Sequence, residues 1–487
     1  MDGNHYTRMR EMAIPKEILE VERPKNTRVK KNGNHYDVIK RTCVYKDGRR
    51  VPKEIGKVGE IIDGVYHEKP KAKETIKPLS YSNVDIMEFG RTELCHKLGS
   101  GILTSLRTCF DEKDAQQIYV MAILRSAYPH VTDRDMKYRY DTSYISTHFP
   151  GVRLSEANVC NFLELLGRNY SRLHGYMQER LNERDPDCIT IVDGMLKDTT
   201  GKESSFVQWS RKSRTKGTKE ISVLYAFDAV RGEPICHKVY PGNMLDMTSF
   251  NDFIDEFKLK DCMVMGDKGF LSKENIAKLK EKKSVHFLLP LKRSDKRIAN
   301  MGLLSFQGTF MDGDDVIEFS KNTVEGMFYY CFRNSTDASN ERNGYLFNTQ
   351  RKGDYCKEKL DKKSDRFGVI CFMSDQDMNP KDVYSMYDRR WEIETFFGFY
   401  KNIVGLNEVR VQGDPSIIGT EFINMISTII SLKLKKKFME KGLDRKYSFS
   451  QIMNYLDQIK KYRDSDNGWK DTITLKYISE LRETLEL

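Results

Sequence analysis

Short apolar runs between residues 188 and 291 constrain the fold of this chain more than any other feature. Three β-branched runs come first and predict consecutive strands at 188–193, 221–228 and 235–240. The pattern then alternates, predicting helices at about 247–258 and 272–282 and strands at 262–267 and 286–291. Three strands followed by alternating helices and strands indicate an α/β domain.

Two of these predicted strands end in an aspartate. Asp193 closes one run, directly before Gly194, and Asp267 closes another, with Ser272 as a plausible N-cap of the next helix. A carboxylate at the end of a strand lies at the rim of the sheet, where side chains from several elements converge. An ordinary turn role for Asp193, and a turn or cap role for Asp267, is the structural alternative, because this is a common use of aspartate.

Other carboxylates compete for the first of these two positions. The alternatives are Asp187, Asp198 and Asp228. Asp228 is the strongest of them, because it also ends a strand-like run. The sequence pattern alone leaves the choice open.

A helix is predicted from Tyr387 to Lys401. At about 100° per residue, Tyr387, Arg390, Glu394 and Lys401 share an arc of roughly 60°, and Glu392 lies on another side. A carboxylate grouped with basic residues on a half-buried helix suits a site that holds a metal ion and phosphates. A surface ladder of ion pairs is the structural alternative.

These four residues fit the spacing Y-(2)-R-(3)-E-(6)-K. That spacing resembles the YREK group of DDE transposases from bacterial insertion sequences, insertion-sequence family four and its relatives. The segment Asp267-Lys268-Gly269-Phe270 resembles the phrase around that group's second aspartate. The resemblance implies an RNase H-like catalytic core, with Asp193, Asp267 and Glu394 as catalytic carboxylates that hold two Mg²⁺ or Mn²⁺ ions.

The implied activity is cleavage of DNA at the ends of the protein's own element and joining of the freed 3′-OH to target DNA. Tyr387, Arg390 and Lys401 would position phosphates, and Lys268 would contact one. Two alternatives remain: an RNase H-like nuclease without strand transfer, and a non-catalytic DNA-binding protein derived from a transposase.

The rest of the chain divides by composition and pattern. The resemblance implies that a β-rich insertion interrupts the core of this α/β protein; a separate small domain is the alternative for that segment. The expected segments are a basic region with a small β-meander (1–85, turning at Lys46 to Gly48), a helical, DNA-binding region (86–182), the first part of the core (183–294), the insertion (295–375), the last part of the core (376–435) and a helical tail (436–487).

A basic loop between the first two core strands is a second candidate DNA contact. It contains Arg211, Lys212 and Arg214, although a solvated loop fits equally well. Trp209 in this loop and Tyr329 in the insertion are candidates for stacking on an unpaired base. Core packing is the alternative for both rings.

Composition fits a polyanionic partner. The chain has 487 residues, and 81 Lys and Arg exceed 71 Asp and Glu, giving a net charge of +10. We expect double-stranded DNA as the partner and a homodimer in the DNA complex. The ten scattered cysteines predict reduced thiols, and the apolar stretch Ile417 to Leu434 predicts a buried helix rather than a membrane span. We therefore expect a bacterial cytoplasmic protein that acts at the nucleoid.

Overall fold

The structure is a computed structural model, and it divides into two compact units, 1–83 and 84–487, which are described separately. It describes residues 14–46, 49–69, 84–185, 189–199, 201, 203–210, 218–244, 246–267, 272–282, 284–464 and 468–487.

The first unit is a small antiparallel β-meander with one short helix. Its elements are α1 (Lys16–Glu20), β1 (Thr27–Asn32), β2 (His35–Lys46), β3 (Arg49–Ile62) and β4 (Val65–Glu68), and the strands lie in the order β1-β2-β3-β4. Val29, Val38 and Ile61 form its small core. The predicted meander is confirmed and begins earlier, at Thr27. Asp47 and Gly48 of the predicted turn lie outside the described residues.

The second unit begins with a strand and a group of helices. These are β5 (Val84–Glu88), α2 (Gly90–Cys109), α3 (Glu112–Ala127), α4 (Met136–Asp141), α5 (Ile145–His148), α6 (Glu156–Arg168) and α7 (Tyr170–Asn182). Ser155 caps α6, because its side chain accepts a hydrogen bond from the Asn158 N–H. The segment from Glu156 to Asn182 forms two helices and not one, because the chain leaves helical geometry at Asn169 (ψ 43°).

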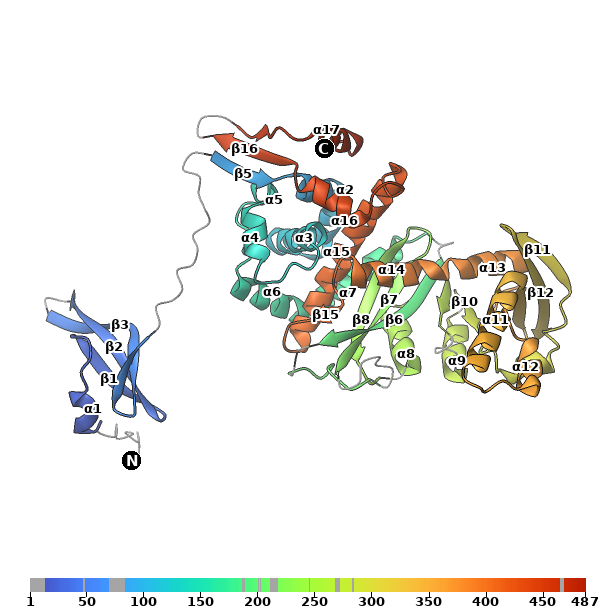
Figure 1. Ribbon diagram of the computed structural model, residues 1–487, viewed down its shortest axis with the longest axis horizontal. Coiled ribbons are helices and arrows are strands. Elements are labelled where there is room, and N and C mark those ends of the chain that lie inside the picture. The colour runs from blue at the N-terminus through green and yellow to red at the C-terminus, as the bar shows by residue number, and fades with distance from the viewer. Residues whose placement is uncertain are drawn as a thin grey trace, which may run out of the picture. The chain divides into compact units, whose positions relative to one another are not determined.

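The predicted order of strands and helices between 188 and 291 is confirmed. The elements are β6 (Ile189–Thr199), β7 (Glu220–Asp228), β8 (Glu233–Pro241), α8 (Asp246–Glu256), β9 (Cys262–Gly266), α9 (Lys273–Glu281) and β10 (Val285–Pro290). They form the sheet order β8-β7-β6-β9-β10 (Figure 1). The pairs β8–β7 and β7–β6 are antiparallel, whereas β6–β9 and β9–β10 are parallel. Ser272 caps α9, as predicted.

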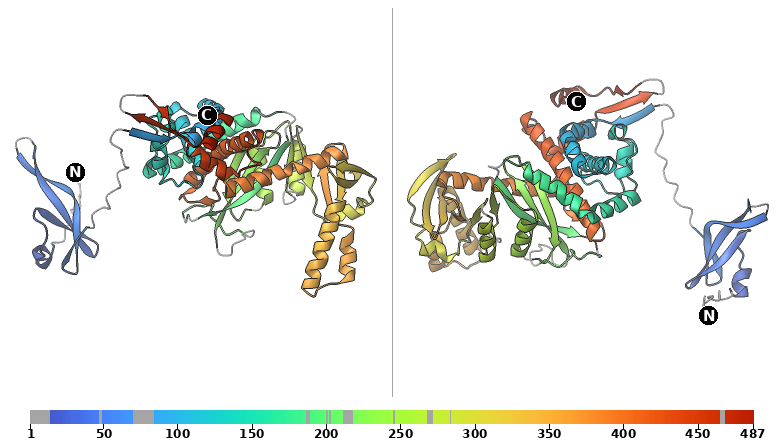
Figure 2. Two further views of the ribbon diagram at one scale, coloured as in Figure 1. Left: turned by 45° about the horizontal axis from the view of Figure 1, so that its top comes forward. Right: turned by 180° about the vertical axis from the view of Figure 1, so that it is seen from behind.

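The segment predicted as a β-rich insertion extends this sheet. Its elements are α10 (Lys296–Asn300), β11 (Gly308–Asp312), β12 (Asp315–Val324), β13 (Met327–Asn334), α11 (Ser335–Arg351), α12 (Lys357–Ser364) and β14 (Val369–Ser374). β14 pairs with β10, and β13, β12 and β11 follow it outward. Two helices, α11 and α12, project beyond the sheet and were not predicted (Figure 2). Polar residues dominate both helices, so little apolar periodicity marks them.

The predicted helix from Tyr387 to Lys401 is wrong in one respect. Two helices, α13 (Pro380–Asp388) and α14 (Arg390–Asn402), meet at Arg389, so Tyr387 lies on a different helix from Glu394. Arg389 keeps near-helical angles (φ −63°, ψ −16°), and Glu392 N–H donates to its carbonyl at 3.0 Å, which marks a tightened turn.

The chain does not stay helical beyond α14. A loop containing β15 (Glu408–Val409) separates α14 from α15 (Asp414–Glu440). The tail expected to be helical contains α16 (Phe449–Leu456), β16 (Lys460–Asp464), β17 (Lys470–Asp471) and α17 (Lys476–Thr484). β16 pairs with β5, so the end of the unit returns to its start. This pairing joins distant segments, and local sequence carries no signal of it.

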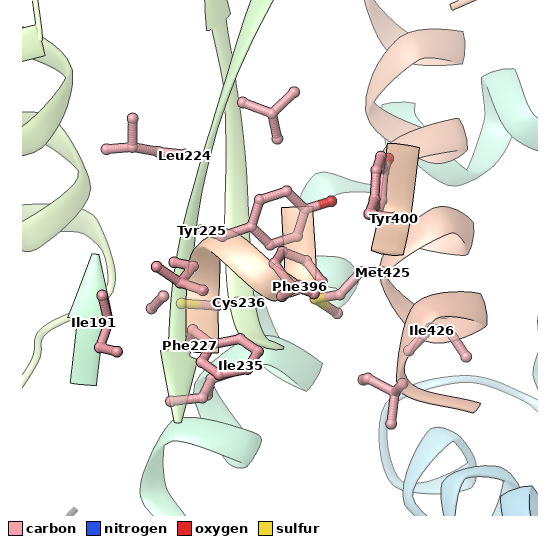
Figure 3. Close-up of a cluster of buried hydrophobic side chains, with 14 of the residues drawn as sticks. Ile191, Leu224, Tyr225, Phe227, Ile235, Cys236, Phe396, Tyr400, Met425 and Ile426 are labelled. Atoms are coloured by element: carbon pink, nitrogen blue, oxygen red, sulfur yellow. The ribbon is translucent and has the colours of Figure 1, made fainter. Parts of the chain in front are cut away.

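Helix α15 lies at the centre of the second unit and packs against α2, α3, α6 and β8. Among the described residues it alone is long and apolar enough to cross a membrane (mean hydropathy 1.4), but 83% of that window is buried in the protein. The predicted buried helix is thus confirmed. Side chains of α14 and α15 meet those of β6, β7 and β8, with the Tyr225 and Phe396 rings 5.3 Å apart (Figure 3).

A charged pair is buried in this core. The Lys197 ammonium on β6 donates to Glu421 Oε1 on α15 at 2.5 Å and to the Tyr400 hydroxyl on α14 at 2.9 Å. Tyr400 in turn donates to Glu421 Oε2 at 3.0 Å, and the side chains of Lys197 and Glu421 are fully buried. Burial lowers the pKa of Lys197, and Glu421 opposes that shift. One network therefore joins β6, α14 and α15.

We expect Lys197→Met to lower the free energy of unfolding by about 3–5 kcal/mol, because it leaves Glu421 buried without its cation. Urea denaturation of the full chain measures this. Arg168→Met is the matched control, since Arg168 and Glu164 form an exposed pair at 2.6 Å whose loss costs less than about 1 kcal/mol. The double variant Lys197→Met/Glu421→Leu should recover most of the loss. Equal effects in Lys197→Met and Arg168→Met would contradict a structural role for the pair.

Candidate active site

Asp193 lies within a strand and not at its end. β6 continues to Thr199, and Gly194 pairs across the sheet with Leu224. A Cβ at position 194 would come within 2.8 Å of Leu224 Cδ1, so a larger residue here would displace the Leu224 side chain; the glycine lies in a paired strand and not in a turn. The expectation that Asp193 closes its strand is therefore wrong.

Strand register nevertheless brings Asp193 to Asp267. The parallel pair β6–β9 ends with Val192 opposite Gly266, so the next residues on both strands stand at the same level. Neighbouring strands lie about 4.8 Å apart, and residues at one level of a parallel pair point to the same face. Asp193 and Asp267 are thus neighbours at the point where β9 ends.

Helix α14 brings the third carboxylate to this place. It packs against β6 through its apolar side, where Ile393 and Phe396 are buried, and Glu394 is half-buried beside them. Arg390 Nη2 lies 2.7 Å from Glu394 Oε1. The Arg390 guanidinium also lies 5.3 Å from the centre of the Tyr387 ring, which packs on Phe372 of β14.

Electrostatics show that these groups share one environment. Burial, together with the charges of Asp267 and Glu394, raises the pKa of Asp193 to about 6. The Gly194 N–H, which donates to Asp193 Oδ1 at 2.8 Å, and the charge of Arg390 oppose the shift. Burial lowers the pKa of Arg390, but Tyr387, Glu394 and Asp193 bring the net shift upward. Three carboxylates and one guanidinium therefore interact directly.

The donor set fits divalent cations. Asp193, Asp267 and Glu394 offer only oxygen, which Mg²⁺ and Mn²⁺ prefer, and mutual repulsion among the three is what a bound cation relieves. Their oxygens do not all lie within 4.8 Å of one another; among the described residues, only His35, Asp37 and Glu60 of the first unit form so tight a group. There the Lys57 ammonium lies 2.5 Å from Asp37 and 2.9 Å from Glu60 and already supplies a cation.

The three carboxylates lie in a segment that matches a known protein family. Residues 184–417 match the family model described as "Transposase DDE domain". The match supports a DDE transposase. The matched segment runs from the residues before β6 into α15 and includes all three carboxylates.

Comparison with curated proteins gives no match. Among solved structures, the chain is similar to "Cryo-EM structure of piggyBac transposase synaptic complex with hairpin DNA (SNHP)", with a TM-score of 0.40 and 11% identity over 76% of this chain and 80% of that chain. The similarity is distant.

The other residues predicted to contact DNA have different outcomes. Lys268, Arg211, Lys212 and Arg214 lie outside the described residues. Lys401 follows Glu394 by about two turns on α14 and is half-buried.

Of the two stacking candidates, Trp209 is 56% exposed, with Lys219 near its ring, whereas Tyr329 is 6% exposed within β13 and presents no free face to a base. The alternative Asp228 is a turn residue, because Oδ1 accepts the N–H groups of Val230 and Arg231.

The sequence interpretation missed the residues that support the site. Lys197, Tyr400 and Glu421 link β6 and α14, the elements that carry Asp193 and Glu394, to α15. A lysine in the apolar run of β6 and a glutamate in the apolar run of α15 were the only signals, and neither identifies the other.

The raised pKa of Asp193 predicts a pH-dependent stability in the metal-free protein. A carboxyl whose folded pKa of about 6 exceeds its ordinary pKa of 3.8 binds more protons when folded, so its contribution to stability falls as pH rises through that window. Asp193→Asn should therefore stabilise the chain at pH 7 in chelator, by at most about 3 kcal/mol, and little at pH 4. Urea denaturation at both pH values tests this, with Asp198→Asn as an exposed control on β6. A difference independent of pH would contradict the assignment.

Proposed function

We propose that this protein is a transposase that cleaves DNA at the ends of its element and joins the 3′-OH ends to target DNA by two-metal-ion phosphoryl transfer. The observation that carries the proposal is the interaction of Asp193, Asp267 and Glu394, three carboxylates from three separate elements within the matched DDE domain.

The sheet supports an RNase H-like core. Three antiparallel strands, β6 to β8, lie beside two strands parallel to β6, in the order β8-β7-β6-β9-β10. β6, the first of these strands along the chain, carries Asp193, and β9, the fourth, directly precedes Asp267. Assignment to the YREK group rests on Tyr387, Arg390, Glu394 and Lys401, of which Tyr387 and Arg390 remain in contact across the helix break.

The three carboxylates would hold the metal ions. Two such ions lower the pKa of an attacking water or 3′-OH and stabilise the leaving oxygen. Asp193 and Asp267, on adjacent strands, offer a fixed pair of oxygens, and Glu394 approaches from α14. The Arg390 guanidinium keeps Glu394 oriented through their 2.7 Å contact and presents positive charge to a phosphate beside the site.

Further contacts would come from the elements around the site. Lys401 lies on α14, and Trp209 carries an exposed ring in the loop between β6 and β7. We propose that Trp209 stacks on a displaced base and that a homodimer holds two DNA ends in the bacterial cytoplasm.

The first test separates chemistry from binding. Asp193→Asn, Asp267→Asn and Glu394→Gln should each abolish Mg²⁺-dependent cleavage of DNA that carries the element ends and leave DNA affinity within a few-fold, because each removes ligand charge while keeping shape. Glu392→Gln, exposed on the same helix, is the matched control and should retain activity. Activity in Glu394→Gln, or equal loss in Glu392→Gln, would overturn the assignment.

A strand-transfer assay with pre-cut ends separates this proposal from its alternatives. Joined products support a transposase, cleavage alone indicates a nuclease, and binding without either indicates a non-catalytic protein.

The second test concerns Arg390 and Lys401. If each contacts one phosphate, an alanine substitution should reduce the slope of log affinity against log salt by about one unit. Lys381→Ala, exposed on α13, is the control and should leave the slope unchanged. A purely structural role predicts instead a lower melting temperature with an unchanged slope, so both quantities are measured on each variant.

A further inference from the structure

Strands β2 and β3 of the first unit extend beyond the rest of their sheet (Figure 2). β1 pairs only with residues 35–40 of β2, and β4 pairs only with residues 59–62 of β3. The Arg41 N–H still donates to the Asn26 carbonyl at 2.8 Å. Residues 42–46 of β2 and 49–53 of β3 pair only with each other, and we name these two segments the ribbon.

The ribbon has no core. Residues 42–44 and 49–53 are all exposed, including Val44 (39%) and Val51 (41%), although successive strand residues point to opposite faces. The unit's own apolar cluster of Val29, Val38 and Ile61 lies at the other end of these strands. A two-stranded hairpin is only marginally stable alone, so a doubly exposed one is a surface for a partner.

One face of the ribbon is cationic. Thr42 pairs with Lys53 and Val44 with Val51, and alternation places Arg49 on the same side. Among the described residues, no carboxylate pairs with Arg49 or Lys53. The cationic face therefore offers two valines between basic groups.

Such a face is suited to DNA. The ribbon from Thr42 to Lys46 spans about 17 Å, and two strands about 4.8 Å apart with their side chains fit a major groove that is about 12 Å wide. Lysine and arginine reach phosphates, and valine methyls can contact the thymine methyl that lies in that groove.

We propose that the ribbon enters the major groove of double-stranded DNA through the face formed by Thr42, Val44, Arg49, Val51 and Lys53. This proposal names an element that engages the DNA partner, and in that respect it rests on the proposed function. Register shifts at Val38/Ile39 and Lys40/Arg41 lie at the base of the ribbon, where bulges bend and twist the strands away from the sheet.

A second copy of the chain is a less suitable occupant. Two cationic faces repel each other, and Pro52 removes a backbone donor from β3. Charge complementarity therefore selects nucleic acid.

The test uses the full-length protein and a 40-bp DNA duplex. Arg49→Ala/Lys53→Ala should reduce the slope of log affinity against log salt by about two units. Lys30→Ala/Lys31→Ala, which removes equal charge from exposed positions on β1, is the matched control and should change the slope by less than half as much. A second variant, in which Asn-Gly replaces residues 43–52 and joins Thr42 to Lys53, should weaken binding without changing the melting temperature of the second unit.

Groove choice is measured by competition and footprinting. Methyl green, a major-groove ligand, should displace the wild-type ribbon, whereas netropsin, a minor-groove ligand, should not. Protection of guanine N7 from dimethyl sulfate should disappear in both ribbon variants. Displacement of the protein by netropsin but not by methyl green would overturn the proposal, and so would equal salt slopes in the two charge variants. A change in oligomeric state with unchanged DNA affinity in the ribbon variants would also overturn it.

The two proposals can fail separately. If wild-type protein binds DNA through the ribbon but never cleaves it, the proposed function fails and the ribbon assignment stands. If the ribbon variants bind normally while Asp193→Asn abolishes cleavage, the ribbon assignment fails and the proposed function stands.

Discussion

The buried contact between Lys197 and Glu421 is the interaction on which the site geometry depends. It joins the strand that carries Asp193 to the central helix α15, and Tyr400 adds α14, the helix that carries Glu394. A charged pair in an apolar interior has few tolerable alternative arrangements, because a slip of α15 along β6 would separate two buried charges, and a slip of α14 would take the Tyr400 hydroxyl away from both. Positioning of the third carboxylate is therefore a property of the core.

Register plays the same part for the two aspartates. They come from adjacent parallel strands, and their separation follows from the pairing of Val192 with Gly266. Because side chains alternate along a strand, a shift of one residue would turn one carboxylate to the opposite face of the sheet. Apolar residues on both faces of β6 and β9 oppose such a shift. The pKa of Asp193 is raised because this carboxyl is buried and because the charges of Asp267 and Glu394 are held near it.

Local patterns predicted the elements of the core, and non-local pairings explain what they missed. The strands and helices from 188 to 291 are readable because each has its own apolar run, and Ser272 is readable as a cap. Asp-Gly in the sequence indicates a turn and therefore a strand end at Asp193; only the pairing of β6 with β7, which continues to Asp198, shows otherwise. The break at Arg389, the projecting helices and the pairing of Lys197 with Glu421 depend on packing between distant segments, which one sequence does not display.

The pairing of β5 with β16 has a consequence for synthesis of the chain. β5 is the first strand of the second unit, and its partner Lys460–Asp464 is synthesised only after the helices and the sheet that lie between them in the chain. Until then β5 presents an open edge, and contacts between segments so far apart in sequence form slowly. A chain that stops before residue 460 therefore keeps all three carboxylates and lacks the strand that closes its helical region. Truncated products would contain all three carboxylates in an incompletely folded unit, which would be exposed to proteases and prone to aggregation.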